Sequence, residues 1–201
     1  MSYKNKIASY QGDCHVLLGK HSMFSDYIKE FSKDQRGHGL DVGAGPQGPN
    51  GKFFTHCETF DGCDADDDVV SSLPKNIYTK TFKYLLGSNQ KLPYSDNSKD
   101  FIVCSCVIQH LSNFDELEIG IQEISRILQR NCQFYLMFKA GTNDTDLTHT
   151  NSFYNEVRTF RVFNPEDVIN LCQKYNLKLL SKETLLDDNW IPYSCLIFEK
   201  N

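Results

Sequence analysis

The positions of apolar residues divide the chain into two kinds of segment that alternate along it. Short runs rich in β-branched and aromatic residues predict buried strands, and stretches with an apolar residue every three or four positions predict helices. The predicted strands are GLDV in 39–42, before a glycine turn, and then 59–64, 79–84, 100–107, 133–138, 177–185 and 193–200. The predicted helices cover 19–33, 50–58, 114–131 and a segment that begins at Pro165.

Two of these helices carry clear start signals. The apolar stripe of the first consists of Phe114, Leu117, Ile121, Ile124 and Leu128. Asn113 and Glu116 are spaced as a capping pair at its start, and Asn131 is the predicted stop. In the second, Asn164 is the expected N-cap and Pro165 the first helical residue, where proline has no amide bond to lose. Both segments are therefore predicted as amphipathic helices.

The order of these elements predicts the fold class. Strands and helices alternate up to the last two strands, which are too close in sequence for a helical crossover and should pair antiparallel. We therefore expect an α/β fold: a doubly wound, mostly parallel seven-stranded sheet with helices on both faces and an antiparallel terminal strand pair. In such folds ligands bind at the carboxyl ends of the strands.

The glycine turn after the first strand reads GAGPQG, a G-x-G-x-x-G pattern. In a dinucleotide site this pattern presents backbone N–H groups to a pyrophosphate, but Pro46 and Pro49 lack them. Gly43 and Gly45 still allow close approach of a ligand without phosphate. Asp41 would repel a pyrophosphate and attract a ligand cation; alternatively, its carboxylate bonds the amides of its own loop. The pattern therefore favours a cofactor other than a dinucleotide.

Asp64 ends the second predicted strand, 19 residues after Gly45 in the sequence. A carboxylate at this position suits the two hydroxyl groups of a ribose. The acidic residues of 66–68 are more simply the start of a helix, where negative charge is favourable. Both dinucleotides and other nucleoside cofactors contain ribose, so Asp64 alone does not choose between them.

Four segments together resemble the class I S-adenosylmethionine (SAM)-dependent methyltransferases. They are GLDVGAG, FDGCDAD, the stretch GSNQKLPYSDNSKDFIVCSCVIQHL, and ELEIGIQEISRIL followed by QFYLMF. Each segment is weakly specific, but their order and spacing match the family over about 39–140. The resemblance implies SAM as cofactor, a Rossmann-like fold and methyl transfer as the activity.

The resemblance also implies roles for individual residues. The methionine part of SAM is assigned to Asp41, Gly43, Ala44 and Gly45; the ribose to Asp64 and Ala65; the adenine to Ser88, Asn89 and Gln90; and the vicinity of the sulfonium to Cys104 and Ser105. Ser88 stands where many family members have Asp, so Ser88 or Asn89 has to supply the adenine contact. The usual glycine turn before the fifth strand is replaced by 130–132, in which Asn131 can adopt a left-handed conformation.

Candidate residues on the acceptor side follow from their positions. SAM carries its own leaving group, so the protein mainly aligns the acceptor, and a base is needed only for a protonated acceptor. His110 is a possible base or, equally, a structural histidine at a helix start. The segment 139–162 is a predicted lid over the site. Its candidate acceptor ligands are His149, Tyr154, Arg158 and Arg161, with Tyr10, Gln11 and His21 as weaker candidates before the core.

Within one expected domain, the resemblance assigns 1–36 to an N-terminal cap, 37–138 to the cofactor-binding core, and 163–201 to a terminal helix and strand pair. The net charge of the chain then limits the classes of methyl acceptor that we expect. The chain has 201 residues and a formal net charge of −5, with no run of Lys or Arg. This gives no general attraction for nucleic acid. A small-molecule or sugar-like acceptor is therefore favoured.

The compartment and metal content are predicted from what the sequence lacks. No apolar stretch has the length of a membrane span, about 20 residues, or the character of a signal peptide. A cytoplasmic protein is therefore expected. The eight cysteines form no C-x-x-C pair, so reduced core thiols and no bound metal are expected.

Three alternatives stay open at this stage. One is a methyltransferase that acts on a protein or RNA with the help of a partner subunit. Another is a SAM-binding regulatory subunit without catalysis, and the third is an NAD-binding protein, since the glycine fingerprint is not unique. The acceptor, the methylated atom and the oligomeric state are not predicted by the sequence.

Overall fold

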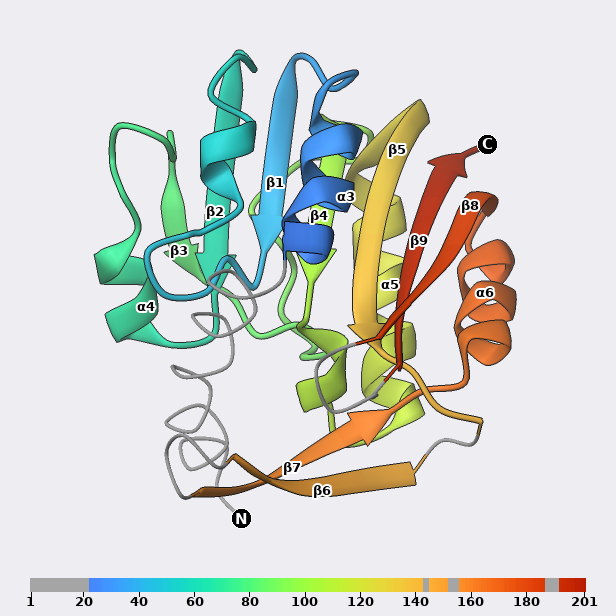
Figure 1. Cartoon of the computed structure of the whole chain (residues 1–201). Coiled ribbons are helices and arrows are strands. Elements are labelled where there is room, and N and C mark those ends of the chain that lie inside the picture. The colour runs from blue at the N-terminus through green and yellow to red at the C-terminus, as the bar shows by residue number, and fades with distance from the viewer. Residues whose placement is uncertain (1–21, 143–144, 152–155, 187–191) are drawn as a thin grey trace.

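The computed structural model describes residues 22–142, 145–151, 156–186 and 192–201 (Figure 1). Its main sheet has seven strands in the order β3-β2-β1-β4-β5-β9-β8. Their bounds are β1 (His38–Val42), β2 (Thr59–Asp64), β3 (Thr81–Lys83), β4 (Lys99–Ser105), β5 (Leu128–Lys139), β8 (Leu177–Leu186) and β9 (Pro192–Lys200). Strands β1 to β5 run parallel, and β9 is antiparallel to both β5 and β8. The predicted doubly wound sheet with its antiparallel terminal pair is confirmed.

Helices cover both faces of the sheet, with α3 in front and α5 behind in Figure 1. The helices are α3 (Ser22–Ser32), α4 (Asp67–Ser72), α5 (Phe114–Ile127) and α6 (Pro165–Lys174). Because side chains alternate along a strand, Leu40 and Ile102 enter the core layer that includes the apolar residues of α5 and α6. Phe101 and Val103 enter the opposite layer, together with Ile28 of α3. The two layers bury both faces of the central strands.

The predicted helix starts are confirmed. Asn113 accepts a hydrogen bond of 2.8 Å from the Glu116 amide, while the Glu116 carboxylate accepts one of 2.7 Å from the Ser112 amide. Asn164 likewise caps α6 by accepting from the Glu166 amide at 3.0 Å. In both helices a side chain satisfies an amide that has no partner within the helix.

Asn131 does not stop a helix, so that prediction is wrong. Helix α5 ends at Ile127, because Leu128 takes an extended conformation and pairs with Lys99 in the sheet. Asn131 lies within β5 and has φ = 61°. The left-handed conformation expected of Asn131 is therefore confirmed, but it serves an irregularity in the strand.

The helix predicted over 50–58 is also wrong. This stretch contains one 3-10 turn, η2 (Gly51–Phe53), and its Gly51 has low helix propensity. Phe54 leaves the turn and enters the core. Its ring centroid lies 4.6 Å from that of Phe60 and 5.1 Å from that of Phe101. Burial of this aromatic group favours a tight turn over a regular helix.

The predicted lid contains a β-hairpin that the sequence analysis did not predict. Strands β6 (Thr145–Asn151) and β7 (Glu156–Val162) pair antiparallel. In Figure 1 the hairpin crosses the end of the molecule toward which the parallel strands point. A short bridge between Ala140 and Phe163 joins the two ends of the segment beside β5. Among the described residues, no helix is long and apolar enough to cross a membrane.

Candidate functional site

The glycine turn lies at the carboxyl end of β1, beside the end of β2. Gly43 and Gly45 have φ values of 69° and 71°, which L-residues with side chains rarely adopt. A Cβ atom on Gly43 would also collide with the Val107 side chain. Gly43 is therefore required by the packing of the protein itself, in addition to any close approach by a ligand.

The backbone amides of this turn are engaged inside the protein. The pairs are Gly43 N and Ala44 N to Cys63 O, Gly45 N to Asp64 Oδ2, Gln47 N to Ser72 Oγ, and Gly48 N to Gly45 O. Pro46 and Pro49 have no amide hydrogen. Within the described stretch 43–49, every N–H group thus has an internal acceptor, and none is left to cradle a phosphate.

Asp64 connects the ends of β1 and β2. Its Oδ2 atom accepts from the Gly45 amide at 3.1 Å, and its Oδ1 atom accepts from the Asp66 amide at 3.1 Å. The side chain is largely buried, and burial raises the pKa of Asp64, while the surrounding amides partly oppose that rise. A carboxylate has about four lone-pair sites, so Asp64 keeps capacity to accept from a hydroxyl-bearing ligand. Ala65, which the sequence analysis also assigned to the ribose, follows Asp64 in the chain and is half-buried.

Asp41 is fully buried below the turn. Its Oδ2 atom accepts a hydrogen bond of 2.8 Å from the Tyr78 hydroxyl, and its Oδ1 atom accepts none from the described residues. Burial raises the pKa of Asp41 to about 7; Tyr78 opposes the rise, and the negative charge of Asp64 adds to it. Asp41 therefore does not organise the loop amides as the alternative interpretation expected. Tyr78 was missed because it follows a short helix with no motif around it.

Ionisation of this buried carboxyl should appear as a pH dependence of stability. The pKa of Asp41 is raised to about 7 from 3.8, so its neutral form stabilises the folded state at low pH. That contribution, on the order of 4 kcal/mol, is lost as the pH rises from about 4 through about 7. We expect Asp41→Asn to remove most of this dependence, as measured by denaturant unfolding at pH 5 and pH 8. Equal pH slopes in the variant and the natural protein would contradict it; Asp67→Asn, at an exposed ion pair with Lys83, is the control.

The candidate adenine residues lie in the loop between β3 and β4. Gly87 begins the turn with φ = 81°. Ser88 is half-buried and donates its amide to the Leu85 carbonyl at 3.1 Å, and its Oγ atom accepts from the Gln90 amide at 3.3 Å. Asn89 and Gln90 are exposed. The loop thus presents two amide side chains and one hydroxyl at its outer bend.

The two candidates beside the sulfonium differ in their surroundings. Cys104 is fully buried, and its thiol belongs to the core layer shared with α5 and α6. Burial raises the pKa of Cys104 well above its usual value. Ser105 is the last residue of β4 and half-buried, and Cys106 after it turns the chain with φ = 61°. Of the two side chains, that of Ser105 is the more accessible at this strand end. The described residues contain no group of three or more His, Cys, Asp and Glu side chains suited to a metal.

His110 and the hairpin meet at the carboxyl ends of β4 and β5. His110 closes the 3-10 turn η3 (Ile108–His110), and its ring lies edge-on to that of Phe160, with centroids 5.5 Å apart. Lys139, at the end of β5, is buried, and its Nζ atom lies 4.8 Å from the ring centroid of Phe160 and 4.8 Å from that of Tyr193. The sequence analysis missed Lys139, although a charged residue directly after an apolar strand is a usable signal.

The remaining acceptor candidates are only partly described. Arg161 donates to the Ser112 carbonyl at 2.6 Å and so ties the hairpin to the segment after η3. His149 and Arg158 are partners in the backbone register of the hairpin. Outside the described residues lie Tyr154, Tyr10, Gln11 and His21.

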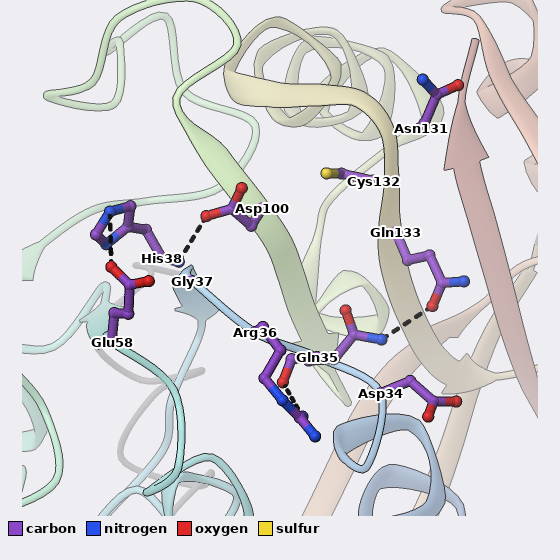
Figure 2. A pocket seen from close by; sticks show the side chains of 10 residues that line it. All are labelled: Asp34, Gln35, Arg36, Gly37, His38, Glu58, Asp100, Asn131, Cys132 and Gln133. Carbon is purple, nitrogen blue, oxygen red and sulfur yellow. Dashed lines mark hydrogen bonds and ion pairs between the residues drawn. The ribbon is translucent and has the colours of Figure 1, made fainter.

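A pocket of about 470 Å³ lies at the opposite end of the parallel strands from the glycine turn (Figure 2). Arg36, His38, Asp100 and Gln133 are among the residues around it. His38 begins β1 and Asp100 is near the start of β4, so this pocket is at the amino ends of the parallel strands. It is therefore separate from the glycine turn, Asp64 and the loop of the candidate adenine residues, which lie at the carboxyl ends.

The fold is a Rossmann-like domain, and the candidate cofactor residues lie at the carboxyl ends of its strands. Residues 40–136 match the family model described as a methyltransferase domain. This match, over just under half of the chain, supports the class I SAM-dependent methyltransferase family, in which S-adenosylmethionine is the cofactor.

Individual relatives agree with this assignment. The uncharacterized methyltransferase YcgJ of Bacillus subtilis (strain 168) is 25% identical over 122 residues, which are 59% of this chain and 47% of that protein. The match therefore spans about half the length of this curated relative. A TehB-like SAM-dependent methyltransferase from Corynebacterium glutamicum has a similar fold, with a TM-score of 0.69, 15% identity and full coverage of both chains. So has a structure of the Haloferax volcanii Trm112 methyltransferase activator in complex with a putative methyltransferase, with a TM-score of 0.74, 11% identity, and coverage of 98% of this chain and 97% of that one.

Proposed function

We propose that this protein transfers a methyl group from SAM to a small-molecule or sugar-like acceptor by in-line displacement. The observation that carries the proposal is the glycine turn, whose amides between 43 and 49 are all engaged internally. Such a turn cannot offer the amide donors that a pyrophosphate requires. It fits a cofactor that carries positive charge and hydroxyl groups and has no phosphate.

The neighbouring carboxylates support the same cofactor. SAM has a sulfonium, an ammonium group and a ribose diol. The buried Asp41, whose Oδ1 atom accepts no hydrogen bond from the described residues, supplies negative charge below the turn in its ionised form. Asp64 has acceptor capacity for the ribose hydroxyls, with Ala65 beside it. The methionine part is assigned to the turn residues 43–45, and the adenine to Ser88, Asn89 and Gln90.

The protein's part in the transfer is mainly alignment. The sulfonium of the bound cofactor supplies the leaving group, so the chain has to position the acceptor atom in line and exclude water. Cys104 and Ser105, at the end of β4, are the residues that we assign to the vicinity of the sulfonium. His110 lies on the acceptor side as the proposed base for a protonated acceptor.

The hairpin forms the acceptor side in this proposal. His110, Lys139 and Phe160 form one contact cluster at the carboxyl edge of the sheet. Arg161 ties the hairpin to the segment after η3. With His149, Tyr154 and Arg158, these residues are the proposed acceptor contacts, and Arg158 and Arg161 among them suit an acceptor with a carboxylate or phosphate.

A second candidate is a methyltransferase that acts on a macromolecule with a partner subunit. It is favoured by the similar fold of the putative methyltransferase solved with the Trm112 activator. That structural match covers 98% of the present chain and 97% of the matched chain. The net charge of −5 favours the small-molecule acceptor, because an acidic chain does not itself attract nucleic acid.

Calorimetric titration of the full chain tests the cofactor assignment. We expect S-adenosylhomocysteine, the product form of the cofactor, to bind with a micromolar Kd, about −8 kcal/mol. NAD, titrated in parallel, should give no binding heat, because the turn has no amides for its pyrophosphate. Binding of NAD with no binding of S-adenosylhomocysteine would overturn the proposal.

A further inference from the structure

One face of α5 lies against the loop that carries the candidate adenine residues. A Cβ atom on Gly87 would collide with the Glu116 backbone carbonyl, and one on Gly120 would collide with Leu86. The loop and helix thus pack closely at two successive turns of α5. Residues 116, 120, 123 and 126 share this face, since neighbours on a helix surface are three or four positions apart.

Glu123 and Arg126, at the last two of these positions, form an ion pair that is hydrogen-bonded to the loop. The Arg126 guanidinium donates from Nε to Glu123 Oε2 at 2.8 Å and from Nη2 to Oε1 at 2.7 Å, a two-point pairing. Glu123 Oε1 also accepts from the Leu92 amide at 2.7 Å. Arg126 further donates to the Tyr94 carbonyl and to Asp96 Oδ1, each at 2.8 Å.

A second attachment fixes the same loop from the other side. The Tyr94 hydroxyl donates to Asp61 Oδ2 at 2.7 Å, and Lys99 Nζ donates to that oxygen at 2.7 Å. The Lys99 and Asp61 side chains are only 4% and 5% exposed. The loop is therefore held by α5 and by the sheet, so its conformation is set by residues far from its exposed bend.

The exposed bend of residues 88–90 lies between these attachments. Gly87 packs on α5 before the bend, and Leu92 and Tyr94 are bonded to the ion pair after it. A short segment fixed at both ends has few conformations open to it, so the amide and hydroxyl groups on it are preorganised for a ligand. Release of one attachment would free one end of the bend and remove this preorganisation.

We propose that Arg126 and Glu123 are positioning residues that give the cofactor site its selectivity for adenine. They do so by fixing Ser88, Asn89 and Gln90, without touching the base themselves. This inference rests on the proposed function, because it assumes that the adenine binds at the bend. The ion pair thus links a surface helix to base recognition.

The test compares two ligands that differ in the hydrogen-bonding edge of the base. S-adenosylhomocysteine carries an amino group at C6 and an acceptor at N1 of the purine, and S-inosylhomocysteine has a carbonyl oxygen at C6 and an N–H group at N1. We expect the natural protein to prefer the former by about tenfold, the value of one hydrogen bond. In Arg126→Met this preference should fall to about one, while the affinity for S-inosylhomocysteine changes little. Calorimetry gives both dissociation constants.

Matched variants separate positioning from a general loss of structure. Glu118→Gln removes a charge from the same helix, where Glu118 pairs with Lys174 of α6, and it should keep the tenfold preference. If Arg126→Met shows no cooperative thermal unfolding, Arg126→Lys and Glu123→Gln take its place, and a reduced preference in both is expected.

The outcomes distinguish this inference from the function on which it rests. If the natural protein binds neither ligand, the proposed function fails. If it binds S-adenosylhomocysteine but shows no preference, or if the folded Arg126 variants keep the full preference, the positioning role is overturned and the proposed function stands.

Discussion

Gly43→Val should abolish measurable binding of S-adenosylhomocysteine and lower the free energy of unfolding. A β-branched residue at φ = 69° is strained by about 1–3 kcal/mol. Its Cβ would also enter the space of the Val107 side chain, an overpacking that typically costs about 1–3 kcal/mol. The turn would have to move away from Cys63 and Asp64, so the cofactor site would be lost with it. Calorimetry and denaturant unfolding measure the two effects.

A double variant separates the backbone strain at position 43 from the collision with Val107. Gly43→Ala with Val107→Ala removes the colliding methyl groups and keeps the unfavourable φ, so it should recover part of the stability that Gly43→Ala alone loses. Val107→Ala alone is the control for the small cavity it leaves. Normal binding and stability in Gly43→Val would contradict the conformation of this turn.

Most strands of the seven-stranded sheet could be predicted because they are apolar runs bounded by turn residues. The run over 59–64 coincides with β2, and the antiparallel order of the last two strands followed from the short connection between them. Helix α5 was recognisable from its stripe and its Asn113 cap. These signals are local, so they can be read from the sequence without any tertiary contact.

The β6–β7 hairpin could not be predicted for the opposite reason. Its strands are rich in Thr, Asn, Asp and charged residues, without the alternation of a half-buried strand. Much of its attachment to the domain comes through Phe160, which is buried against His110 and Lys139. Tertiary contacts of this kind override a weak local preference.

The residues of the candidate site likewise fall into those that the sequence could predict and those that it could not. Asp64 and the glycine turn follow from strand ends and residue types, which the sequence displays. The partner of Asp41, the Tyr78 hydroxyl, comes from 37 residues further along the chain. In the sequence, Glu123 and Arg126 look like an ordinary ion pair on the surface of α5. Their hydrogen bonds to the backbone of Leu92 appear only in the folded chain. Long-range hydrogen bonds of single side chains leave no periodic pattern.

Asp64→Asn should weaken binding of S-adenosylhomocysteine by at least about 100-fold. Hydrogen bonds to a charged group contribute about 1.5–3 kcal/mol each, so two ribose hydroxyls account for about 3–6 kcal/mol. At 1.4 kcal/mol per tenfold change this is about two to four orders of magnitude in Kd. Asp67→Asn, which changes an exposed carboxylate three residues away, should stay within about twofold, as expected of a surface ion pair.

The internal bond between Asp64 and the Gly45 amide requires a second ligand in this test, because a loss of affinity through the turn has to be distinguished from a loss of contact with the ribose. An analogue of S-adenosylhomocysteine without the two ribose hydroxyls makes no contact with the carboxylate in our proposal. It should bind the natural protein and Asp64→Asn with the same Kd, so that the whole loss depends on the hydroxyls. If both ligands lose affinity equally, Asp64 acts through the Gly45 turn alone and does not hold the ribose.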